Sequence, residues 1–283
     1  MRRRTIASTV LSAPAATVIG VGEHCHGDLL SWAVRLEVAR ALVQRAGRRL
    51  VVLTENIDFN VAGLRRKTPR WKRGGDGDDG GEFHPFLVHL SNRLPAHMDA
   101  ARELSRLAEG RVYGVDVQAL EHPHLPGGRY VRSKMRGMTP PRGDGTLRNR
   151  QNAEIVLSIA RDFSRRDPNT VVMYLAQNEH VALDCSACRG GGYTTEGALL
   201  RQALGPGGYT SIATYARNLG SFWNEERTWR VRRERSRNAP PSRVLLRGAP
   251  WTILQKKQKP VYTLGGGEYT TAHFDYTVAT NAA

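Results

Sequence analysis

The densest chemistry in the chain lies at residues 22–27, where a short apolar run ends in the sequence Gly-Glu-His-Cys-His-Gly. Glu23 and His26 stand three residues apart, so they share one face if the chain winds into a helix at this point. A carboxylate beside an imidazole is a general-base arrangement, because the carboxylate orients the ring and the ring can take a proton from water near neutral pH. The alternative is a Glu and a His that cap the following helix and meet solvent.

Other polar side chains follow apolar runs in the same way. Glu55 comes directly after the run 49–54, and Asp116 lies near the end of the run 111–118. Gln177, Asn178 and His180 follow the run 170–176. Chemistry-bearing residues at the ends of several apolar segments indicate one site assembled from distant parts of the chain.

The elements that must position these residues are buried strands and amphipathic helices. The pattern predicts a strand over 17–21, a helix over 28–46 and a second strand over 49–54. This order indicates a right-handed βαβ unit with a parallel sheet, whose ligands bind at the carboxyl ends of the strands. Glu23 and Glu55 are then expected on neighbouring strand ends. Further helices are predicted over 86–108, 147–163 and 198–204, with a strand beginning at residue 209.

We therefore expect one α/β domain over residues 1–283, a mainly parallel sheet flanked by helices, with loop excursions. Glycine-rich and charged segments at 65–82 and 127–145 read as mobile loops, and 227–240 as a basic loop. The net charge of +16 suggests weak, nonspecific binding of polyanions. No apolar run is long enough for a membrane span, and three cysteines favour a reducing, cytoplasmic location.

At these residues the sequence resembles the erythromycin esterase family, and the resemblance covers nearly the whole chain. The family opens with a strand, Gly-Glu, two variable residues, His-Gly and a helical arginine. The matching positions here are Gly22, Glu23, His26, Gly27 and Arg35. A later family strand ends in His-Asn-x-His, which Asn178 and His180 match while Gln177 replaces the first histidine. Phe274-Asp275 fits the closing strand.

The resemblance implies a hydrolase that cleaves an ester or lactone, in the family's case macrolide antibiotics, without a metal or other cofactor. His26 would be the general base, Glu23 and Glu55 would orient or stabilise it, and Arg35 and His180 would hold the carbonyl oxygen or developing oxyanion. The expected substrate contacts are Asn178, Gln177, Asp116 and Arg150, with Arg148 as the alternative to Arg150. The absence of a Gly-x-Ser-x-Gly sequence speaks against a serine nucleophile.

Two other functions stay open at this stage. The same Glu and His residues could bind a divalent metal or a haem in a protein of related fold. The chain could also be a catalytically inactive relative that binds anions or nucleic acid through its arginine-rich segments, with Gln177 as the sign of lost catalysis.

Overall fold

The structure is a computed structural model of the 283-residue chain. It describes residue 10 and residues 16–23, 29–56, 95–121, 128–184, 194–216, 251–254, 260–262, 268–270 and 273–280. The segments predicted as loops at 65–82 and 227–240 lie outside these ranges, as does the site histidine His26.

A seven-stranded sheet in the order β3-β2-β4-β1-β5-β9-β6 forms the centre of the described structure. Six strands run parallel to one another: β1 (Val18–Glu23), β2 (Arg49–Thr54), β3 (Val112–Gly114), β4 (Thr170–Gln177), β5 (Tyr209–Ala216) and β9 (Tyr276–Thr280). The edge strand β6 (Trp251–Leu254) pairs antiparallel with β9. Strands β7 (Pro260–Tyr262) and β8 (Glu268–Thr270) form a separate antiparallel pair. The predicted mainly parallel α/β sheet is confirmed.

The lateral order corrects one expectation. Strands β1 and β2 are not neighbours, because β4 lies between them and pairs with both. Glu23 and Glu55 are therefore separated by the end of β4. The apolar pattern of a strand shows that both its faces are buried but does not specify its neighbours.

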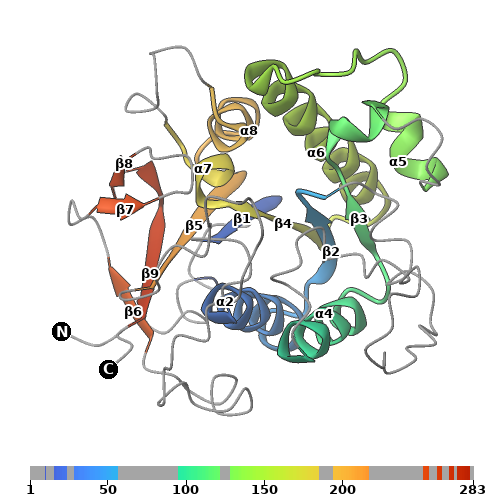
Figure 1. Cartoon of the computed structure of the whole chain (residues 1–283). Coiled ribbons are helices and arrows are strands. Elements are labelled where there is room, and N and C mark those ends of the chain that lie inside the picture. The colour runs from blue at the N-terminus through green and yellow to red at the C-terminus, as the bar shows by residue number, and fades with distance from the viewer. Residues whose placement is uncertain are drawn as a thin grey trace, which may run out of the picture.

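Helices cover both faces of the sheet, as Figure 1 shows. On one face lie α2 (Leu29–Arg40), its π-helical continuation (Ala41–Arg45) and α4 (Pro95–Leu107). On the other lie α5 (Arg129–Lys134), α6 (Gly145–Arg166) and α8 (Glu196–Leu204). The short helix α7 (Asn178–Val181) continues from β4. Successive strand residues alternate between the two cores, Leu50 and Val52 facing α2 and α4, Val51 and Leu53 facing α6.

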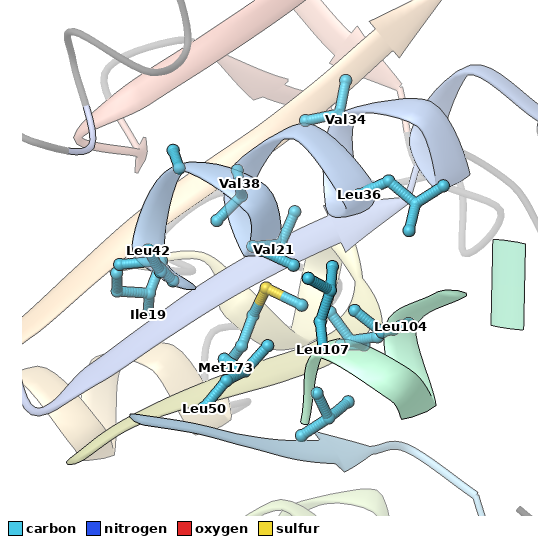
Figure 2. Close-up of a cluster of buried hydrophobic side chains, with 14 of the residues drawn as sticks. Ile19, Val21, Val34, Leu36, Val38, Leu42, Leu50, Leu104, Leu107 and Met173 are labelled. Atoms are coloured by element: carbon cyan, nitrogen blue, oxygen red, sulfur yellow. The ribbon is translucent and has the colours of Figure 1, made fainter. Parts of the chain in front are cut away.

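The core beneath α2 and α4 is shown in Figure 2. Ile19 and Val21 of β1 lie in one core with side chains of α2, α4 and the strands β2 and β4. Met173 of β4 packs in the same core. Each fully buried aliphatic side chain contributes about 1.5–3 kcal/mol, so this packing stabilises the sheet against α2 and α4.

Two predicted boundaries change in the structure. The segment 127–145, expected to be a loop, contains α5. The part of the predicted helix 86–108 that precedes residue 95 lies outside the described residues, and the described part is α4. Helix α6 begins at Gly145, where the Asp144 side chain accepts a hydrogen bond from the Leu147 N–H at 2.9 Å.

Within the described ranges, no helix has both the length and the apolar character that crossing a membrane requires.

Candidate active site

The carboxyl ends of four parallel strands bring the predicted site residues to one edge of the sheet. Glu23 is the last residue of β1, Gln177 the last residue of β4, and Glu55 follows β2 directly. Asp116 lies two residues after β3, and its N–H bonds the carbonyl of Asn56. Across the sheet the order is Glu23, Gln177, Glu55, Asp116.

A buried ion pair joins β1 to α2. Arg35 Nη1 donates to Glu23 Oε2 at 2.9 Å, and the two side chains are only 4% and 7% exposed. Arg35 Nη2 donates to the Ala176 carbonyl of β4 at 3.1 Å. The Arg35 guanidinium also lies 5.3 Å from the centre of the Trp32 ring. Glu23 and Arg35, both predicted site residues, are thus in contact, and they fix the end of β1 against β4.

The Glu55 carboxylate accepts hydrogen bonds from three directions. Oε1 receives Arg148 Nη2 at 2.9 Å and lies 3.0 Å from His180 Nε2. Oε2 receives the backbone N–H of Gln177 at 3.0 Å. Two of these donors carry charge, which makes such bonds stronger than neutral ones. Glu55 and His180, predicted to act in one site, are therefore direct partners.

Arg148, in the first turn of α6, holds two carboxylates together. Its Nε and Nη2 atoms contact Asp116 at 3.1 and 2.9 Å, and Nη2 also contacts Glu55. Burial alone would lower the pKa of Arg148, but Asp116 and Glu55 outweigh it and raise the pKa well above its ordinary value. Arg150, predicted as the site arginine, is exposed. The arginine that reaches the site is Arg148.

His180, on α7, is 95% buried between two carboxylates. Nε2 faces Glu55, and Nδ1 lies 3.6 Å from Glu196 Oε1. Burial alone would lower the pKa of His180, but Glu55 and Glu196 overcome that effect and raise the pKa to about 9. His180 therefore carries a proton on both nitrogens at neutral pH, and it can donate hydrogen bonds but cannot take a proton from water.

This charge makes stability depend on pH. The pKa of a histidine in the unfolded chain is about 6.5, whereas the pKa of folded His180 is about 9. The stabilisation is fully present below pH ~6.5 and is lost as the pH rises through ~9. Between these values the free energy of unfolding should fall by up to about 1.4 kcal/mol per pH unit. Urea unfolding across this window, compared with His180→Asn, measures the slope; equal slopes in the two proteins would contradict a charged His180.

Asn178 links two elements of the site through hydrogen bonds to Thr214. Its Oδ1 accepts the Thr214 N–H at 3.1 Å, its Nδ2 donates to the Thr214 carbonyl at 2.7 Å, and the residue is fully buried. A Cβ at Gly22 would lie 2.2 Å from Asn178 Oδ1, so only glycine fits under this bridge. The structure thus places Asn178, expected to contact substrate, in a bridge from the start of α7 to β5.

The connection between Glu23 and Leu29 contains His26 and lies outside the described residues. Gln177 pairs with Glu23 in the sheet register and contacts Glu55 through its backbone N–H. The residue that replaces the first family histidine therefore lies between the two predicted catalytic carboxylates.

Glu196, whose carboxylate lies 3.6 Å from His180, was not singled out from the sequence, and neither were the two residues that donate to it, Tyr174 and Asn152. Glu196 follows Thr195, which caps α8 by accepting the Ala198 N–H at 3.0 Å. An acid after such a cap reads as a surface residue, yet Glu196 is fully buried. Two features of the sequence could have indicated these residues. Tyr174 is a polar residue within an aliphatic strand, and Asn152 is a polar residue on the apolar face of α6.

Comparison with known proteins supports the fold and leaves the activity to be tested. No family model matches the chain, and no curated protein matches it in sequence. Solved structures do match. A histidine-to-asparagine mutant of the erythromycin esterase EreC in its open conformation is 14% identical, with 98% of this chain and 96% of that one covered and a TM-score of 0.57.

Two further solved structures share the fold. A succinoglycan biosynthesis protein is 11% identical, with a TM-score of 0.61 over 96% of this chain and 88% of its own. A protein from Bacillus cereus is 13% identical, with a TM-score of 0.55 over 98% and 92%. The chain therefore has the fold of erythromycin esterase-like proteins.

Proposed function

We propose that this protein is a hydrolase that cleaves an ester or a lactone with a water molecule activated by histidine. The observation that carries the proposal is the buried Glu55, which bonds both a charged arginine and a charged histidine at the carboxyl edge of the sheet. This edge is where open α/β sheets bind ligands. The fold shared with an erythromycin esterase supports the same reaction class.

The roles follow from the charge of each group. His180 already holds its protons at neutral pH, so it serves as a donor and the general base must be a different residue. His26 fits that role, because it is three residues after Glu23 and an unperturbed imidazole titrates near about 6.5. The Glu23–Arg35 pair fixes the strand end from which residues 24–28 continue.

Arg148 is the group best placed to bind the substrate carbonyl. Its side chain is 21% exposed, compared with 10% for Glu55 and 6% for Asp116. Its Nε and Nη2 atoms bond the carboxylates, while Nη1 has no acceptor among the described residues. A guanidinium held on one side and free on the other is a preorganised donor for a developing oxyanion.

The reaction then runs in two balanced steps. His26 takes a proton from water as the water oxygen bonds the carbonyl carbon, and the carbonyl oxygen becomes an anion that Arg148 stabilises. The carbon–oxygen ester bond breaks as the anion collapses, and the leaving alkoxide takes the proton from His26. Water is consumed, and an acid and an alcohol, or one hydroxy acid from a lactone, are released.

We expect this activity to survive treatment with a chelator. In the described part of the chain, His, Cys, Asp and Glu side chains form no cluster of three that could hold a metal ion. Glu55 and Asp116 already share the guanidinium of Arg148 as their counterion. Rates measured before and after EDTA, with metal content determined in parallel, test this. Loss of activity that zinc or manganese restores would favour the metalloprotein alternative.

A panel of ester and lactone substrates tests the proposed function directly. Purified protein is assayed for acid release from simple aryl esters, aliphatic esters and lactones of increasing ring size, macrolides included. At least one substrate should be hydrolysed faster than in buffer, and the rate should drop in Arg148→Lys, where a planar fork becomes a point charge. Hydrolysis of none, or a rate unaffected by Arg148→Lys, would contradict the proposal.

A further inference from the structure

Glu196 is a buried carboxylate that was not predicted from the sequence. It lies in the first turn of α8 and has no exposed surface. Its Oε1 is 3.6 Å from His180 Nδ1, on the side of the ring opposite Glu55. Two carboxylates from distant segments of the chain thus bracket one imidazole, Glu55 after β2 and Glu196 in α8.

Two donors contact the Glu196 carboxylate and favour its ionised form. The Tyr174 hydroxyl donates to Oε2, and Asn152 Nδ2 donates to Oε1 at 2.9 Å. The Asn152 amide has a defined orientation, because its Oδ1 accepts the Val117 N–H at 2.8 Å. Its NH₂ group must therefore face Glu196. Hydrogen bonds donated to a carboxylate favour the charged state.

The charges around His180 require a second cation. Three carboxylates, Glu55, Asp116 and Glu196, lie in one connected group, and among the described residues the permanent cation of this group is Arg148. With a neutral imidazole these described side chains would carry a net charge of about −2 in a region with little solvent. Such charges are costly to bury unless they are paired.

We propose that Glu196 is a positioning residue that keeps His180 doubly protonated, so that His180 acts as a fixed cationic donor on Glu55. Tyr174 and Asn152 act through Glu196 in the same direction. The inference deepens the proposed hydrolase function by giving His180 one role and excluding it as the base.

The pKa shifts of the group reflect both burial and charge. Burial is the largest cause and raises the pKa of Glu196 overall, while charged His180 and the hydrogen bond from Tyr174 oppose that rise. Burial also raises the pKa of the Tyr174 hydroxyl, with the nearby Glu196 charge adding to it, so the hydroxyl stays a donor. For His180, the two carboxylates overcome burial and the opposing charge of Arg148.

Titration of the His180 ring by NMR tests the inference without requiring a substrate. The His180 signal is assigned by its loss in His180→Asn. In the unmodified protein we expect a midpoint near pH 9, and in Glu196→Gln a midpoint lower by about one pH unit or more. Glu103→Gln is the matched control, because Glu103 pairs with Arg40 and Arg106 outside the site; its midpoint should equal that of the unmodified protein.

Tyr174→Phe provides a second variant if Glu196→Gln does not fold. Removing the hydroxyl takes one donor from Glu196 and should also lower the His180 midpoint. An unchanged midpoint in a folded variant, or a His180 ring that is neutral at pH 7 in the unmodified protein, would overturn the inference. If the midpoints shift as expected while no substrate is hydrolysed, the role of Glu196 stands and the proposed hydrolase function fails.

Discussion

Replacing His26 by asparagine should reduce the rate of ester hydrolysis by about 10²–10⁴-fold, the usual contribution of a positioned general base. Asparagine is similar in size and keeps one hydrogen bond but cannot accept the proton of water. The proposed roles lead to the same expectation, because a raised pKa of about 9 makes His180 a donor rather than the base. The rate of the unmodified protein should rise with pH through a midpoint near about 6.5.

His24→Asn is the matched control, because it makes the same chemical change two residues earlier in the chain. Its rate should stay within a few-fold of the unmodified protein. Circular dichroism and thermal unfolding establish that both variants fold. Equal rates in His26→Asn and the unmodified protein would remove His26 from the mechanism, whatever substrate is used.

Replacing Arg148 by methionine should lower the free energy of unfolding by about 3 kcal/mol. The side chain bonds Glu55 and Asp116 in a region where those carboxylates are 10% and 6% exposed. Methionine keeps much of the length of the side chain but removes the guanidinium that the two carboxylates share. Asp116 then has no cation among the described residues, and Glu55 keeps His180. Urea unfolding at pH 7 measures the loss.

Arg150→Met is the matched control, because Arg150 lies on the same helix, two residues away, and is exposed. The free energy of unfolding of this variant should stay within about 0.5 kcal/mol of the unmodified protein. Adding Asp116→Asn to Arg148→Met should recover part of the loss, because it removes one of the stranded charges. A loss equal to that of Arg150→Met would show that Arg148 does not serve as the counterion.

The strands of the site could be predicted because their sequences are unambiguous. Uninterrupted apolar runs at β1, β2 and β4 lead directly into Glu23, Glu55 and Gln177, and this pattern is typical of buried parallel strands. The placement of β4 between β1 and β2 could not be read in the same way. Periodicity shows which faces are buried, and lateral order depends on how the helices pack over them.

The choice between Arg148 and Arg150 was beyond sequence for a related reason. Residues two apart in a helix point in different directions, and the face of α6 that meets the sheet is known only after packing. Glu196 could not be recognised because it follows Thr195. A threonine cap followed by an acidic residue is an ordinary pattern at the start of a helix.

The insertion of β4 between two earlier strands has a consequence for how the molecule folds. The Glu23–Arg35 pair spans 12 residues, whereas Glu55 meets Arg148 across 93 residues and the Gln177 N–H across 122. Contacts between segments far apart in the sequence form slowly, because the chain loses loop entropy before it gains them. One half of the site can thus form early and locally. The other half appears only when β4 enters the gap, which makes recovery of catalysis a late reporter of refolding.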